Sequence, residues 1–199
     1  MMKLNTWKTC TMLMYRGVVL YSLCGFAFLC LKMYKFESNE SDPTFLYMLN
    51  SVNISIMIGC LMLLAGLHAF RKLVAASDVP AVRRLYIAAI LNTLSAACAL
   101  ADLLELGEEA MMGMLGLRAI LQIAAFIYMF FGAKKLQTST ALRAEARQGA
   151  EKLYKAMRLM LIGMGLAYIP LINSISMICF IIGFIRMMRG WGAIARAYR

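Results

Sequence analysis

The chain has 199 residues, of which 62% are hydrophobic and 16% are charged. A soluble domain is typically about half apolar and about a quarter charged, so this chain has too little polar surface to fold alone in water. In a soluble protein, its net charge of +11 would suggest nucleic-acid binding. Basic residues with interleaved aromatics occur only beside long apolar segments, however, so we expect a protein that contacts the lipid bilayer and binds no nucleic acid.

Six apolar segments are long enough to cross about 30 Å of hydrocarbon as helices, which takes about 17 to 25 residues each. Together they use most of the chain, so residues 1–199 are predicted to form one transmembrane domain without a separate soluble part. The predicted fold is an all-α integral membrane protein, a six-helix transmembrane bundle of three consecutive helical hairpins. The expected spans are residues 12–33, 45–70, 85–104, 111–133, 153–169 and 171–188.

The last two spans meet at Pro170, so this region forms either one long kinked helix or a hairpin. A helix over residues 153–188 would be roughly 54 Å long at 1.5 Å per residue, well beyond one hydrocarbon core. A single crossing would also place the basic residues of 143–158 opposite those of 186–199, against the positive-inside rule. A hairpin is therefore the favoured interpretation.

The basic residues are distributed unequally between the two faces of this topology. The face that carries both termini has 18 basic and three acidic residues, a net charge of +15, whereas the other face has three basic and seven acidic residues, a net charge of −4. Short loops rich in Lys and Arg stay in the cytoplasm. We therefore expect a multi-pass protein of a bacterial inner membrane or plasma membrane with both termini cytoplasmic.

Several polar residues lie inside the predicted spans, where each costs free energy unless it faces a partner or a cavity. Asp102 and Arg118 belong to the outer half of one hairpin, and the arginine can extend toward the carboxylate. The two form either an ion pair that locks the hairpin or part of a solute site that opens outward. The other polar residues expected at such a site are Asn50, Asn53, Asn92, Gln122 and Asn173.

A stripe of small residues recurs every four positions in the third span, where it comprises Ala89, Thr93, Ala97 and Ala101. Small side chains let helices approach closely in a membrane. The stripe predicts either a central third helix or a docking face for a membrane-protein partner or a second copy of the chain.

Residues 138–158 are predicted to form an amphipathic helix on the cytoplasmic face. An apolar stripe that runs from Leu142 to Met157 faces away from the basic residues. Such a helix lies on anionic headgroups or meets a cytoplasmic partner, and we favour lipid contact. The residues expected to contact headgroups are Arg143, Arg147, Lys152 and Lys155.

The sequence contains no Gly-rich phosphate loop, no H-E-x-x-H and no G-x-S-x-G motif, and its six cysteines include no C-x-x-C pair. We therefore expect a protein that is not an enzyme and that holds no metal or other cofactor. Three functions remain open: a solute-binding or transport-related protein, a non-catalytic accessory or scaffolding subunit of a membrane complex, and an oligomeric pore. The polar residues around Asp102 and Arg118 favour the first.

Overall fold

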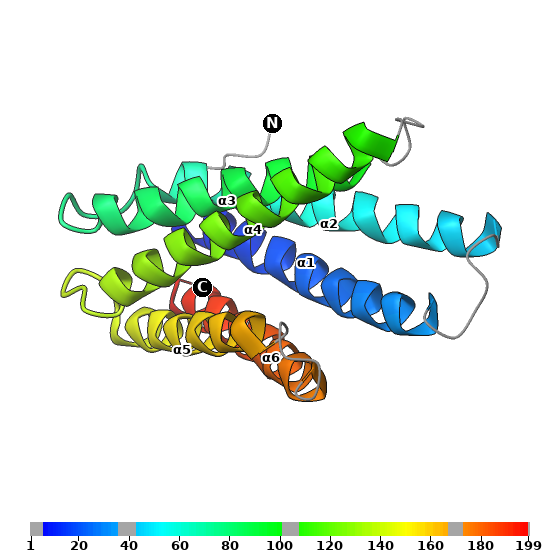
Figure 1. Cartoon of the computed structure of the whole chain (residues 1–199). Coiled ribbons are helices and arrows are strands. Elements are labelled where there is room, and N and C mark those ends of the chain that lie inside the picture. Colours follow the sequence, from blue (N-terminus) through cyan, green and yellow to red (C-terminus); the bar gives the residue numbers. More distant parts are fainter. Residues whose placement is uncertain (1–5, 36–42, 101–107, 167–172, 199) are drawn as a thin grey trace.

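The computed structural model describes residues 6–35, 43–100, 108–166 and 173–198, and its regular structure is helical. Figure 1 shows how the helices of this described part are arranged. They are α1 (Trp7–Lys35), α2 (Pro43–Phe70), α3 (Val79–Leu100), α4 (Glu108–Leu136), α5 (Ala144–Leu166) and α6 (Asn173–Ala197). The expectation of an all-helical, six-helix chain is confirmed.

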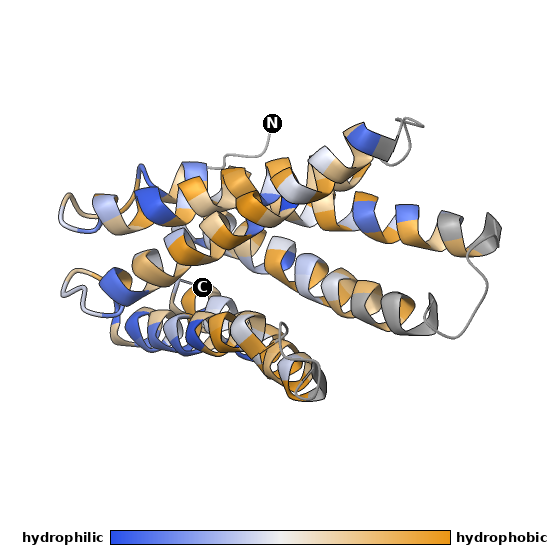
Figure 2. Cartoon of the chain, in the orientation of Figure 1, coloured by the Kyte–Doolittle hydropathy of each residue, from blue (hydrophilic) through white to orange (hydrophobic). Residues whose placement is uncertain are grey.

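Four of these helices are long and apolar enough to cross a membrane. Their candidate spans are Trp7–Phe28, Tyr47–Phe70, Glu109–Leu136 and Ile175–Ala197. A helix is the natural form for such segments because lipid offers no hydrogen-bond partners and a helix satisfies its own backbone. Hydrophobic residues dominate the middle of the helices, whereas hydrophilic residues gather where α4 ends and α5 begins (Figure 2). These properties indicate a multi-pass integral membrane protein.

The helices pack most extensively in the consecutive pairs α1 and α2, α3 and α4, and α5 and α6. In the last pair, Gly149 faces Gly190, and the Ser176 hydroxyl donates a hydrogen bond of 2.7 Å to the Gly163 carbonyl. The later residue of α5, Gly163, thus contacts the earlier residue of α6, Ser176. The two helices are therefore antiparallel and form a hairpin rather than one kinked helix. Further contacts of α2 with α3, α4 with α5 and α1 with α6 close the helices into a ring.

Glycines allow the closest helix contacts in the first and third hairpins. A Cβ atom added at Gly17 would lie 2.7 Å from the Gly59 carbonyl oxygen, and one added at Gly149 would lie 2.7 Å from that of Gly190. Such distances leave no room for a side chain, so the backbones themselves are in contact, as in other membrane helix pairs with small residues at the interface.

The small-residue stripe of the third span does not coincide with the buried face of α3. Ala89 is buried, Thr93 is half-buried and Ala97 is exposed, while Ala101 lies outside the described residues. A spacing of four drifts around a helix of 3.6 residues per turn, so the stripe leaves the core within two steps. Because α3 packs chiefly against α2 and α4, it is a member of the ring and not its centre. A docking role for the exposed part stays a prediction.

The predicted connector helix (residues 138–158) and fifth span (residues 153–169) overlap in sequence, and the structure has one continuous helix, α5, over residues 144–166. The apolar stripe of the predicted connector packs into the core, where Ala146, Ala150, Leu153 and Met157 are fully buried. An amphipathic pattern shows that one face is covered but does not say by what, and here other helices cover it instead of lipid. The basic residues Arg143, Arg147, Lys152 and Lys155 are exposed, and their contact with headgroups stays a prediction.

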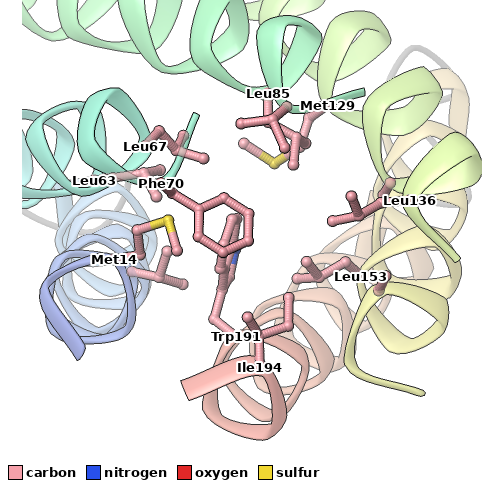
Figure 3. Packing of buried hydrophobic residues seen from close by; sticks show 14 of the residues in the cluster. Met14, Leu63, Leu67, Phe70, Leu85, Met129, Leu136, Leu153, Trp191 and Ile194 are labelled. Carbon is pink, nitrogen blue, oxygen red and sulfur yellow. The ribbon is translucent and has the colours of Figure 1, made fainter. Parts of the chain in front are cut away.

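The hydrophobic core occupies one half of the bundle along the helix axes, the half that holds both ends of the described chain. All six helices contribute to it, with Met14 from α1, Phe70 from α2, Leu85 from α3, Leu136 from α4, Leu153 from α5 and Trp191 from α6 (Figure 3). These side chains fill the space between the helices. Space for a ligand between the helices therefore lies in the other half.

Polar and aromatic contacts join the helix ends and turns of this filled half, which we call the closed end (Trp7, Phe70, Ser139 and Tyr198). The ring of Trp7 stacks on that of Tyr198, with centroids 4.4 Å apart, and meets the edge of Phe70 at 5.4 Å. The Ser139 hydroxyl donates a buried hydrogen bond of 2.6 Å to an oxygen of Asp78. These contacts join α1 to α2 and α6, and the turn before α3 to the turn after α4.

Candidate binding pocket

A pocket of about 440 Å³ lies in the half of the bundle that faces away from the closed end. Every helix contributes to its lining, from Tyr21 of α1 to Phe184 of α6. Phe126 of α4 belongs both to the pocket and to the hydrophobic core, so the core forms the inner boundary of the pocket.

One wall of the pocket is polar and is built mainly by α2 and α3. Asn53 of α2 and Asn92 of α3 are only 3% and 7% exposed. Neither side-chain oxygen (Oδ1) has a hydrogen-bond partner among the residues that the structure describes. Leaving a buried polar group unpaired costs about 1–3 kcal/mol. Two residues that line one pocket therefore each carry a buried amide oxygen without a partner among the described residues.

A chain of hydrogen bonds links three helices beside these asparagines. The Ser95 hydroxyl of α3 donates to Oε1 of Gln122 in α4 at 3.0 Å, and Nε2 of Gln122 donates to the Tyr21 hydroxyl of α1 at 3.3 Å. A side-chain amide that gives and accepts one bond each is fixed in orientation. These hydrogen bonds therefore hold the polar wall in place next to the core.

Arg118 also lines the pocket, four residues before Gln122 on α4. Its guanidinium carbon lies 5.3 Å from the centre of the Phe28 ring of α1, a cation–π contact that links α4 to α1. The expected ion pair with Asp102 stays a prediction because Asp102 lies outside the described residues.

The opposite wall is apolar and largely aromatic. It comprises Phe28 of α1, Met164 of α5, and Phe180 and Phe184 of α6. The Phe184 ring meets that of Tyr21 at a centroid distance of 6.2 Å and an angle of 67°, an edge-to-face arrangement. The pocket thus offers hydrogen-bond acceptors and donors on one side and ring faces on the other.

The structure brings together four of the seven residues that the sequence predicts for a solute site, namely Asn53, Asn92, Arg118 and Gln122. Asn50 lies three residues from Asn53 on α2, is half-buried and does not line the pocket. Asp102 and the side chain of Asn173 lie outside the part of the chain that is described.

Sequence reasoning missed Tyr21 and the phenylalanines of the apolar wall. A phenylalanine in an apolar span is equally compatible with lipid, so its identity carries no signal about the side it faces. Tyr21 did carry a usable signal, because a phenol group in a span needs a hydrogen-bond partner.

Comparison of this chain with known protein families, with curated proteins and with solved structures finds no match.

Proposed function

We propose that this protein binds a small solute in the pocket between its six helices and that binding serves the movement of this solute into or across the membrane. The observation that carries the proposal is the pair of buried, unpaired amide oxygens of Asn53 and Asn92 in one pocket of the described structure. The pocket volume of about 440 Å³ falls in the range of about 300–1,000 Å³ that is typical of small-molecule sites.

We infer binding without catalysis and without a cofactor. The described lining residues supply amides, hydroxyl groups, one guanidinium group and aromatic rings, and include no Asp, Glu, His or Cys. General acid–base or nucleophilic chemistry at neutral pH uses such titratable groups. The lining instead suits hydrogen bonding and apolar contact.

We further infer that the closed end faces the cytoplasm, which places the pocket in the outer half of the bundle. The support is the positive-inside rule, because Arg71 and Lys72 after α2, Arg83 and Arg84 at the start of α3, and Lys134 at the end of α4 all lie near the closed end. A fusion of green fluorescent protein to the C-terminus should fluoresce in bacterial cells. A dark fusion that is nevertheless inserted in the membrane would contradict this orientation.

A thermal-shift screen of the purified protein against small solutes with hydrogen-bond donors tests the binding proposal. A ligand at 100 times its dissociation constant should stabilise the protein by about 2.7 kcal/mol. The shift should shrink in Asn92→Leu and persist in Asn50→Leu, a matched asparagine that does not line the pocket. Solute effects that are the same in both variants and the wild type would refute it.

A second function, as an accessory subunit of a membrane complex, is favoured by one observation. In the outer half of α4, a Cβ atom added at Gly113 or Gly116 would meet no neighbour within 4 Å among the described residues, and Met112 and Leu117 are exposed. A helix surface of small and apolar residues suits contact with another membrane helix. Purification in a mild detergent followed by mass measurement distinguishes the two, because only the accessory role requires a stoichiometric protein partner.

A further inference from the structure

The pocket is closed on its polar side and open on the side of α4. Asn53, Asn92 and Ser95 are buried, so α2 and α3 seal that wall. On α4, by contrast, Leu115 is 50% exposed and Ala119 is exposed, although both line the pocket. The α4 wall therefore lies at the surface of the bundle.

On one side α4 is joined to α3 by the hydrogen bond from Ser95 to Gln122, so the exposed α4 wall opens toward its other neighbour, the hairpin of α5 and α6. Near the closed end α4 packs against α5, with the rings of Phe130 and Tyr154 centred 5.0 Å apart. From there α4 runs away from α5 and α6 (Figure 1). Of the described residues of α5, only Met164 reaches the pocket.

The three helices that flank this opening carry exposed apolar side chains. Ile120 of α4 is 66% exposed, Ile162 of α5 is 48% exposed and Ile178 of α6 is 54% exposed. Exposed large apolar side chains on a membrane helix contact lipid chains rather than water. A molecule that passes between α4 and this hairpin therefore comes from the bilayer.

The polar wall restricts the chemistry of that molecule. The Asn53 and Asn92 oxygens accept hydrogen bonds, so the ligand group that pairs with them must be a donor, and an ionised carboxylate or a phosphate diester group has no hydrogen to donate. A cationic head is disfavoured by the Arg118 guanidinium, which lines the same pocket. A neutral head with hydroxyl or amide donors remains, with an apolar body that lies along Phe180 and Phe184.

We propose that the ligand is a neutral, membrane-dissolved amphipath with a hydroxyl or amide head, and that it reaches the pocket sideways between α4 and the hairpin of α5 and α6. This inference rests on the proposed function of the pocket and adds the chemical class of the ligand and its route. The head pairs with the asparagine oxygens, and the apolar body extends toward the opening.

A photoreactive monoacylglycerol, with a diazirine group in its acyl chain, tests the inference on the full-length protein in phosphatidylcholine nanodiscs. After irradiation, peptide mass spectrometry should find labelling at pocket residues such as Phe180, and unlabelled monoacylglycerol should compete whereas glycerol should not. The double variant Asn53→Leu/Asn92→Leu should label about tenfold less in the pocket, equivalent to about 1.4 kcal/mol. Asn50→Leu should label as the wild type does.

A second variant, Ala119→Trp, tests the route with the polar wall intact. Ala119 is exposed, so the larger side chain is accommodated without repacking the core, and the thermal unfolding midpoint should not fall. Pocket labelling should drop several-fold because the indole fills the opening. Pocket labelling that persists in Ala119→Trp, or that is equal in the double variant and the wild type, overturns the inference.

The thermal-shift screen with small solutes distinguishes failure of the amphipath proposal from failure of the proposed binding function. If water-soluble solutes stabilise the protein in a way that depends on Asn92 while the amphipath labels only lipid-facing residues, the pocket binds a solute of another class. If neither kind of molecule depends on Asn53 or Asn92, both proposals fall and water alone satisfies these oxygens.

Discussion

Replacing Gly59 by alanine should weaken the first hairpin and disturb the pocket at the same time. A Cβ atom at this position would lie 2.8 Å from the Gly17 carbonyl oxygen and 2.8 Å from the Tyr21 backbone nitrogen. Both obstacles are backbone atoms of α1, so no side chain can turn aside. Ordinary van der Waals contact begins at 3.4 Å, so α1 and α2 must separate by roughly 0.6 Å here.

The expected loss of stability follows from two opposing effects. Overpacking of a close interface typically costs about 1–3 kcal/mol. Alanine is favoured over glycine within a helix by about 1 kcal/mol, which offsets part of this cost. The net loss for Gly59→Ala should therefore be up to about 2 kcal/mol. Gly116→Ala on α4 is the matched control, since no described neighbour lies within 4 Å of its Cβ position and only the helix-propensity gain applies.

The same displacement should weaken ligand binding because Tyr21 lies at the point of contact. The hydrogen bond from Gln122 to Tyr21 is already 3.3 Å long, so a shift of α1 away from α2 is expected to strain or break it. Thermal unfolding in detergent measures the first effect, and monoacylglycerol labelling of the folded protein measures the second. If Gly59→Ala were as stable as Gly116→Ala, the close backbone contact between α1 and α2 would be refuted.

Two further substitutions test the closed end and the surface of α5. Ser139→Ala removes the hydrogen bond to the buried Asp78 carboxylate and should destabilise the protein by about 1–3 kcal/mol in thermal unfolding, whereas an unchanged midpoint would show that another donor replaces it. The exposed Glu151 carboxylate accepts a bond of 2.6 Å from Lys155, and this bond and charge lower the pKa of Glu151 below its ordinary value of 4.5. Because the folded-state pKa is the lower one, the stability from this pair is present above pH 4.5 and lost as the pH falls through the lowered pKa. Lys155→Ala should raise the pKa of Glu151, measured by carbon NMR of the carboxyl group, toward its ordinary value, and an unchanged pKa would show that the pair does not form.

The hairpins were predictable because length and charge each constrain them. Apolar segments of the right length give the helices, and the basic residues on both sides of Pro170 require the chain to turn back. The convergence of Asn92, Arg118 and Gln122 was predictable for a related reason, since polar residues in spans avoid lipid and therefore face one another.

The extent of α5 and the aromatic wall were not predictable because they depend on partners far away in the sequence. The stripe from Ala146 to Met157 has the period of a half-covered helix, which is the same whether lipid headgroups or α6 cover it. Likewise, α3 packs closely on α4 at Gly132, where an added Cβ atom would lie 2.8 Å from the Leu85 side chain. The spacing of small residues within α3 carries no information about the position of that glycine.

The length of the exposed apolar surface on α4 and α5 explains why the pocket opens where it does. On α4, exposed apolar residues extend from Met111 to Phe131, about 32 Å at 1.5 Å per residue, and the charged residue within this range, Arg118, is half-buried and lines the pocket. On α5, the exposed Arg158 leaves only Leu159–Leu166 free of charge among the described residues, about 12 Å. The charge-bearing part of α5 is packed against the core at Leu153 and Met157, so its apolar part begins only where α4 has already moved away. Thus α4 supplies a long apolar wall and α5 a short one. Within the described part of α5, Met164 alone lines the pocket. The side opening of the pocket is therefore a consequence of where the basic residues of α5 lie along the chain.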